Sequence, residues 1–108
     1  MKRSTTRILT THTGSLPRPA ALVDLMLAEQ AGRLADRQVL AEETRRAVAE
    51  VVHQQSAAGL DVINDGELNR VDYTVYVKER LQVDRKIVWM KLRSLVEGAQ
   101  LATRELWP

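Results

Sequence analysis

The sequence predicts an α/β fold in which a long helical crossover joins two parallel strands. A short apolar run at residues 8–9 is typical of a buried strand, helical periodicity covers most of residues 20–58, and a second apolar run follows at residues 60–64. Strands joined by such a crossover are parallel, and the connection is right-handed. The carboxyl ends of both strands should therefore share one edge, where α/β proteins place substrate groups.

The composition indicates one ordinary domain at most, and it favours neither a nucleic-acid nor a membrane partner. The 108 residues include 16 basic and 14 acidic side chains, so the net charge of +2 is weak support for nucleic-acid binding. No apolar run approaches the roughly 20 residues of a membrane span. The first seven residues are basic but lack the apolar core of a signal peptide, so a cytoplasmic protein is expected. The absence of cysteine excludes disulfides and thiolate metal ligands in this chain.

The first predicted strand covers residues 7–11, and a turn rich in polar side chains follows it over residues 10–19. Within the turn, Gly14 permits a positive φ or the close approach of a ligand, and Ser15 adds a hydroxyl group. Two prolines stiffen the exit, and the second of them suits the first turn of a helix.

Two helices are predicted between the strands. The first covers residues 20–31, and the second begins after the N-cap Asp36 and ends at Gly59, a residue suited to the left-handed cap position. The buried stripe of the second helix should consist of apolar side chains at helical spacing: Val39, Leu40, Ala47, Val48, Val51 and Val52. The second strand ends in an Asp-Gly turn, and residues 71–81 are again helical in pattern.

Six polar side chains should meet at the shared strand edge: His12, Ser15, Asp65, Glu67, Arg70 and Asp72. His12 is either a ligand contact or a partly buried hydrogen-bonding residue. For Arg70 and Asp72, the favoured interpretation is an ion pair that shapes the loop. His53, which stands beside two glutamines in the second helix, is interpreted as a surface residue.

The C-terminal stretch, residues 83–108, predicts one more helix and no third strand. Its apolar side chains form one helical face: Val88, Leu92, Leu95, Val96, Ala99, Ala102 and Leu106. This is more apolar surface than a lone helix can bury. The tail should therefore pack on a core or mediate self-association, and it lacks the concentrated basic face of a membrane-surface helix.

Two stretches together resemble the cobalamin-independent methionine synthase family, in particular its shorter single-barrel members. Residues 11–19 read THTGSLPRP, which is similar to the opening motif of the family, and residues 59–72 read GLDVINDGELNRVD, which is similar to its second-strand motif. Tyr76 also falls where the family has an aromatic residue. The resemblance covers roughly residues 7–82.

The resemblance implies that residues 1–82 are the N-terminal βαβα portion of a (β/α)8 barrel, followed by a divergent, mainly helical tail at residues 83–108. A complete barrel needs about 250 residues, so the resemblance identifies the chain as an N-terminal fragment. Family members transfer a methyl group from methyltetrahydrofolate to homocysteine, with zinc activating the thiol. The zinc ligands of the family lie downstream of the matched segment, so no metal site, cofactor or catalytic residue is expected in this chain.

By the same resemblance, four residues would bind the substrate. Gly14 and Ser15 would hold the carboxylate of homocysteine, Glu67 would pair with its ammonium group, and His12 is a further candidate. The chemistry is suitable, because a hydroxyl group and backbone N–H groups suit a carboxylate and a carboxylate suits an ammonium group.

Two other functions stay open. Full methionine synthases carry an apolar residue where this chain has Thr13 and a histidine where it has Asp65. A related zinc-dependent thiol alkyltransferase, such as the epoxyalkane–coenzyme M transferase type, is therefore an alternative. The second alternative is a non-catalytic helical remnant that binds a partner through its tail.

Overall fold

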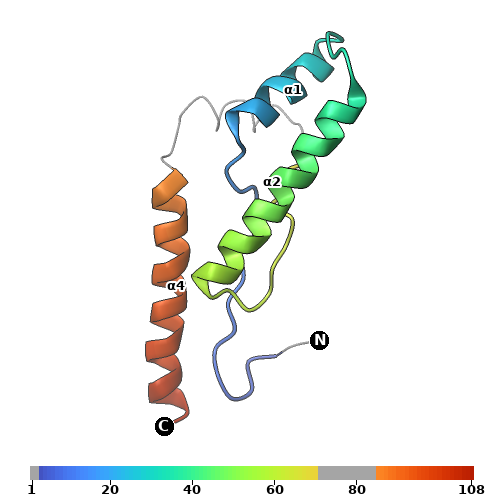
Figure 1. Cartoon of the computed structure of the whole chain (residues 1–108). Coiled ribbons are helices and arrows are strands. Elements are labelled where there is room, and N and C mark those ends of the chain that lie inside the picture. Colours follow the sequence, from blue (N-terminus) through green and yellow to red (C-terminus); the bar gives the residue numbers. More distant parts are fainter. Residues whose placement is uncertain (1–2, 71–84) are drawn as a thin grey trace.

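Three helices form most of the computed structural model, which describes residues 3–70 and 85–108. They are α1 at Ala20–Gln30, α2 at Arg37–Ala58 and α4 at Arg85–Leu106. Figure 1 shows α2 in the middle, with α1 folded back along its N-terminal half and α4 beside its C-terminal end. The predicted helix at residues 71–81, Tyr76 and the predicted boundary at residue 82 lie outside the described residues.

The predicted α/β fold, a βαβα portion of a barrel, is wrong for the described part of the chain, which is helical and contains no strand. The two predicted strands, residues 7–11 and 60–64, are irregular segments that run side by side. They form one isolated parallel bridge, between Thr11 and Val62. The expected parallel direction is thus kept in a single bridge, and the predicted helical tail is present as α4.

A side chain interrupts the pairing of these segments. The carboxylate of Asp61 accepts the N–H of Thr10 at 2.8 Å, although a β-ladder would pair that N–H with a backbone carbonyl group. The N–H groups of Asp61 and Val62 in turn both donate to the carbonyl of Thr10. Side-chain competition of this kind replaces ladder bonds, and two parallel segments alone are too few for a stable sheet.

The predicted starts and ends of the first two helices agree with the structure to within one residue. Asp36 accepts the N–H of Gln38 at 2.8 Å and so caps α2, which ends at Gly59 with φ of 90°. Pro19 precedes α1 in an extended conformation. Short-range signals therefore decide where these helices begin and end.

The core lies along one narrow face of α2. Its buried apolar residues in the described part of the chain are Leu16, Leu22, Met26, Ala47, Val51, Ala58, Leu60, Leu68, Leu92 and Val96. The predicted stripe of α2 is too wide, since Val39 and Val52 are 43% and 38% exposed. His53 is exposed, as predicted, whereas Gln55 is fully buried on the core face.

α4 packs on α2 through Leu92 and Val96. Contact is close at the end of α2, where a Cβ added to Gly59 would lie 3.1 Å from Val96 Cγ1. Two residues of the predicted apolar face of the tail are not covered by other residues, since Leu95 and Leu106 are 47% and 63% exposed. Within residues 3–70 and 85–108, no helix has the length and apolar character needed to cross a membrane.

Candidate functional site

Two loops, residues 12–19 and residues 64–70, form the candidate site and are called here the first and the second loop. The N–H of Leu16 in the first loop donates to the carbonyl of Gly66 in the second at 2.9 Å. Gly66 has φ of +67°, and a Cβ at this position would lie 2.9 Å from Leu16 Cβ. Glycine is therefore required both for the backbone conformation and for the close approach of the loops.

Asn64 connects the two loops to α2. Its Nδ2 donates to the carbonyl of His12 at 2.6 Å, and its Oδ1 accepts the N–H of Gly66 at 2.8 Å. Its own backbone is bound by Gln55, whose Nε2 donates to the Asn64 carbonyl at 2.7 Å while Oε1 accepts the Asn64 N–H at 3.3 Å. A fully buried side chain of α2 thus sets the position of the second loop.

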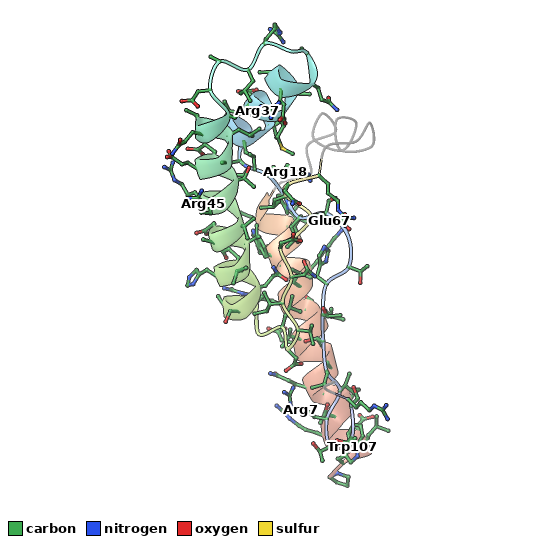
Figure 2. All side chains as sticks on the ribbon, turned by 90° about the vertical axis from the view of Figure 1, so that its right-hand side faces the viewer. Arg7, Arg18, Arg37, Arg45, Glu67 and Trp107 are labelled. Carbon is green, nitrogen blue, oxygen red and sulfur yellow. The ribbon has the colours of Figure 1, made fainter. Side chains whose placement is uncertain are left out.

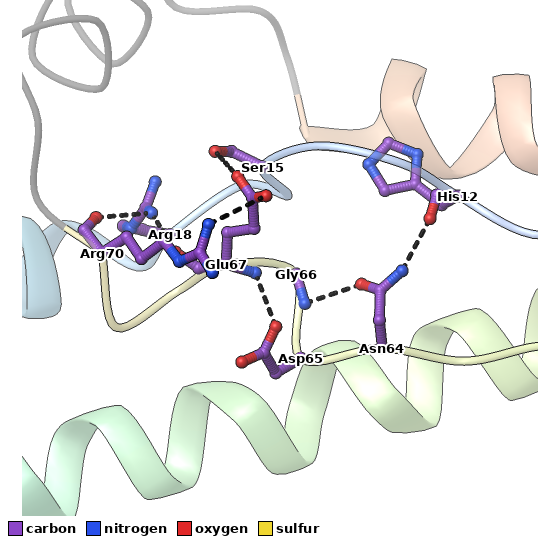
Figure 3. Close-up of polar contacts among 8 residues, drawn as sticks. All are labelled: His12, Ser15, Arg18, Asn64, Asp65, Gly66, Glu67 and Arg70. Atoms are coloured by element: carbon purple, nitrogen blue, oxygen red, sulfur yellow. Dashed lines mark hydrogen bonds and ion pairs between the residues drawn. The ribbon is translucent and has the colours of Figure 1, made fainter.

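Ser15 and Glu67 meet across the two loops, as Figure 3 shows. Ser15 Oγ donates to Glu67 Oε2 at 3.2 Å, although the two residues are 52 positions apart in the sequence. Glu67 has φ of 56°, which is uncommon for a residue with a side chain. Its N–H donates to Asp65 Oδ1 at 3.0 Å. The geometry therefore brings together one hydroxyl group and one carboxylate from the predicted set.

Arg70 lies beside Glu67, with Arg70 Nη1 at 3.7 Å from Glu67 Oε1. Both side chains are substantially exposed, at 74% and 40%, so this ion pair adds little stability. Asp72, the predicted partner of Arg70, lies outside the described residues, and that ion pair stays a prediction.

Gly14 and His12 occupy different surroundings in the first loop. Gly14 has φ of +98°, and no atom lies within 4 Å of the position that a Cβ would take. His12 Nε2 is buried and has no hydrogen-bond partner among the described residues. The backbone carbonyl of His12 accepts from Asn64, and both interpretations of its side chain stay predictions.

Arg18 is the largest fully buried side chain of the described residues, at 2% exposure. Its Nε donates to the carbonyl of Leu68 at 3.2 Å, and its Nη2 donates to the carbonyls of Glu67 at 2.5 Å and Arg70 at 3.0 Å. Figure 2 shows Arg18 and Glu67 near the middle of the molecule, well separated from Arg7 and Trp107 at one end.

Asp61 forms a second polar cluster at that end, apart from the two loops. Its carboxylate accepts from the N–H and the hydroxyl group of Thr10, and Arg7 Nη1 lies 2.6 Å from Asp61 Oδ1. Burial would raise the pKa of Asp61, but the bonds from Thr10 and Arg7 and the charge of Arg7 outweigh it, so the pKa is lowered. A pocket of about 250 Å³ lies here between the N-terminal segment and α4, lined in part by Gln100 and Thr103.

Metal ligands do not gather in the part of the chain that the structure describes. Over residues 3–70 and 85–108, no three side chains of His, Asp or Glu lie close enough together to hold a metal ion. The expectation that this chain holds no zinc stays a prediction.

Four polar residues that organise the structure were not predicted from the sequence: Arg18, Gln55, Asp61 and Asn64. A signal existed for Gln55, because it continues the four-residue spacing of Ala47 and Val51 on the buried face of α2. Arg18 offered no comparable signal, since the carbonyl groups that it binds lie about fifty residues further along the chain.

Comparison with known proteins gives a consistent result. Residues 8–97 match the family described as the catalytic domain of cobalamin-independent synthases, and the match extends into α4. The methionine synthase of Sulfurisphaera tokodaii is 39% identical over 72 residues, which are 67% of this chain and 21% of that protein. The methionine synthase of Sulfolobus acidocaldarius is 36% identical over 81 residues, which are 75% of this chain and 24% of that protein.

A longer relative is also similar. The 5-methyltetrahydropteroyltriglutamate–homocysteine methyltransferase of Streptomyces avermitilis is 40% identical over 72 residues, which are 67% of this chain and 9% of that protein. The chain thus spans a quarter or less of the length of these curated relatives. No solved structure matches the chain.

Proposed function

The chain belongs to the cobalamin-independent methionine synthase family, and we propose that its two loops bind the amino-acid end of homocysteine in a methyltransferase that makes methionine. The observation that carries this proposal is the contact of 3.2 Å between Ser15 Oγ and Glu67 Oε2. An α-amino acid carries its carboxylate and its ammonium group on one carbon atom. A site for it therefore needs a donor for the one directly beside an acceptor for the other, and these two side chains supply that pair.

The roles of the individual residues follow from this arrangement. Glu67 would accept the ammonium group, and the hydroxyl group of Ser15 would turn from Glu67 to the carboxylate of the ligand. Gly14 supports the proposal because the space beside its Cα is open, so a ligand can approach the backbone there. Arg70 would give up its weak ion pair with Glu67 when the ammonium group binds.

The proposed role of the two loops concerns the amino-acid end of the ligand and not the activation of its thiol. The family resemblance implies that zinc would activate the thiol in the complete enzyme, through ligands that lie downstream of the matched segment. The proposal is accordingly limited to binding and orienting the amino acid, and it assigns no step of methyl transfer to these residues.

The test uses a full-length family member that carries both motifs. Replacing the equivalent of Glu67 by Gln keeps the shape and removes the charge. A charge-assisted contact contributes about 1.5–3 kcal/mol, so homocysteine should bind roughly ten- to a hundredfold more weakly, with folate affinity unchanged. Ser15→Ala should have a smaller effect, because backbone N–H groups would still hold the carboxylate.

A matched control is Glu50→Gln, the same change at an exposed position of α2, which should alter neither affinity. Unchanged homocysteine binding in the Glu67→Gln variant would remove the role given to Glu67. It would favour the alternative in which the thiol has no amino group, as in coenzyme M.

A further inference from the structure

Arg18 is buried more completely than a charged side chain normally is, which requires a physical reason. Its exposure is 2%, and burying a guanidinium group is costly unless its N–H groups are satisfied. Its N–H groups donate to the carbonyl groups of Glu67, Leu68 and Arg70, all in the second loop. The side chain of one loop thus binds the backbone of the other.

The bonds from Arg18 act on the residue with the unusual backbone conformation. Glu67 has φ of 56°, a conformation that disfavours residues with a Cβ. Its N–H is bound by Asp65 Oδ1 and its carbonyl by Arg18 Nη2. With its peptide groups held on both sides, Glu67 directs its carboxylate at Ser15, as Figure 3 shows.

The chain around Arg18 is itself stiff. Arg18 stands between Pro17 and Pro19, and a residue before proline is restricted to extended backbone conformations. The planar guanidinium group presents several N–H donors in a fixed geometry, which a lysine ammonium group does not reproduce. Little conformational freedom therefore remains between the backbone of the first loop and the carbonyl groups that Arg18 binds.

We propose that Arg18 is a positioning residue, which fixes the backbone of Glu67 and thereby sets the place of the carboxylate that receives the substrate ammonium group. The inference about the substrate rests on the proposed function. The fixing of the second loop by Arg18, called here the hold of Arg18, rests only on the hydrogen bonds from its side chain to the backbone of that loop. Arg18 itself touches no substrate in this proposal.

The first experiment needs no ligand and uses the 108-residue chain. In an Arg18→Lys variant, amide hydrogen exchange of Leu16 and Glu67 should accelerate by about tenfold, equivalent to the loss of roughly one hydrogen bond to a charged donor. Exchange of Val51 in α2 should stay unchanged, because a general loss of stability would accelerate all three amides alike. The matched control is Arg45→Lys, the same change at an exposed position of α2.

A measurement on the unaltered chain covers the case in which the variant does not fold. The Nε–H of Arg18 donates to the carbonyl of Leu68, so its NMR signal should be resolved and should exchange slowly with water. Rapid exchange of this N–H, or unchanged exchange of Leu16 and Glu67 in a folded Arg18→Lys variant, would overturn the proposed hold.

The second experiment measures substrate binding in a full-length family member with both motifs. Arg18→Lys should raise KM for homocysteine about tenfold and leave KM for the folate substrate unchanged. In a Glu67→Gln background the same change should have little further effect, since Arg18 acts through Glu67 and such effects are not additive. Additive losses, or equal losses for both substrates, would contradict positioning.

The two proposals fail in different ways. If Glu67→Gln leaves homocysteine binding unchanged while exchange of the loop amides still responds to Arg18→Lys, the proposed function is wrong and the hold of Arg18 is correct. If Glu67→Gln weakens homocysteine but Arg18→Lys does not, Glu67 keeps its role and Arg18 loses the one proposed here.

Discussion

The paired loops and α4 are attached to the same helix, α2, by different kinds of interaction. The loops are attached through a buried polar group, since Gln55 of α2 binds Asn64, and Arg18 of the first loop joins them to each other by binding carbonyl groups of the second loop. α4 rests mainly on apolar contacts of Leu92 and Val96. A hydrogen bond from the Ile8 N–H to Thr103 Oγ1 is added near its end.

The difference has a physical consequence for each region. Hydrogen bonds between buried groups are directional, so they determine one loop geometry, and an unmatched group there costs free energy. Apolar contacts are not directional, and α4 leaves Met90 and Leu101 more than 60% exposed. Substitutions in the loops should therefore affect geometry and stability, while those on the outer face of α4 should affect association.

The largest effect is expected where the two loops touch. Gly66→Ala places a Cβ against Leu16 and keeps a positive φ, so it combines backbone strain of about 1–2 kcal/mol with overpacking of about 1–3 kcal/mol. Urea denaturation should show a free energy of unfolding lower by roughly 2–5 kcal/mol. At Gly14 no atom lies near the position of a Cβ, so Gly14→Ala should lower the free energy of unfolding only by the backbone strain. Equal decreases for Gly66→Ala and Gly14→Ala would contradict the close approach of the two loops at Gly66.

Gln55→Leu tests the connection between α2 and the second loop. The change removes the partners of the Asn64 N–H and carbonyl groups, and unsatisfied buried groups cost about 1–3 kcal/mol. Amide chemical shifts of Asn64 and His12 should move as well. The control is Gln54→Leu, because the Nε2 of Gln54 binds Glu50 at the exposed surface. This change should alter the free energy of unfolding by no more than about 0.5 kcal/mol. A loss at position 54 as large as at 55 would exclude a specific role of Gln55.

We expect the hydrogen bonds of the Asp61 carboxylate to make a pH-dependent contribution of about 1 kcal/mol to the free energy of unfolding, the usual size for a hydrogen-bonded group. Its pKa is lower in the folded chain, so the unfolded chain binds more protons in acid. The contribution is fully present above the unfolded pKa of about 3.9, and it is lost as the pH falls through the lower folded pKa. Asp61→Asn should flatten the dependence of unfolding free energy on pH in this window.

Arg7→Gln provides a graded comparison for Asp61. It removes the ion pair and leaves both bonds from Thr10 to Asp61, so the dependence on pH should become shallower without disappearing. The same slope in the unaltered chain and in Asp61→Asn would show that this carboxylate does not stabilise the fold.

The smallest effect on stability is expected on the outer face of α4. We predict that the chain self-associates through its exposed apolar side chains, and that replacing Met90 and Leu101 by Lys lowers the average mass in sedimentation equilibrium. Unfolding free energy should change by no more than about 0.5 kcal/mol. Val96→Lys, at a buried position, should instead prevent α4 from packing. A chain that sediments as a monomer at all concentrations would contradict the prediction.

Sequence alone determined the features that depend on neighbouring residues. The cap at Asp36 and the left-handed Gly59 were predictable because each depends on the local backbone and on one or two nearby groups. Pro19, expected in the first turn of the helix, instead precedes α1 in an extended conformation. The two motifs were sufficient to indicate the family, and they contain Ser15 and Glu67, whose side chains are in contact in the structure. Periodicity also predicted α4 as a helix, although Leu95 and Leu106 lie outside its buried face.

Tertiary structure alone decided which polar groups from distant segments form hydrogen bonds with each other. Two apolar runs gave the expectation of strands, but the Asp61 carboxylate takes the Thr10 N–H that a ladder needs, and one bridge remains. Arg18 is buried where three carbonyl groups about fifty residues away converge on it. Backbone propensity and helical period act over a few residues, whereas the free energy of a buried polar group depends on partners that only the folded chain brings within reach.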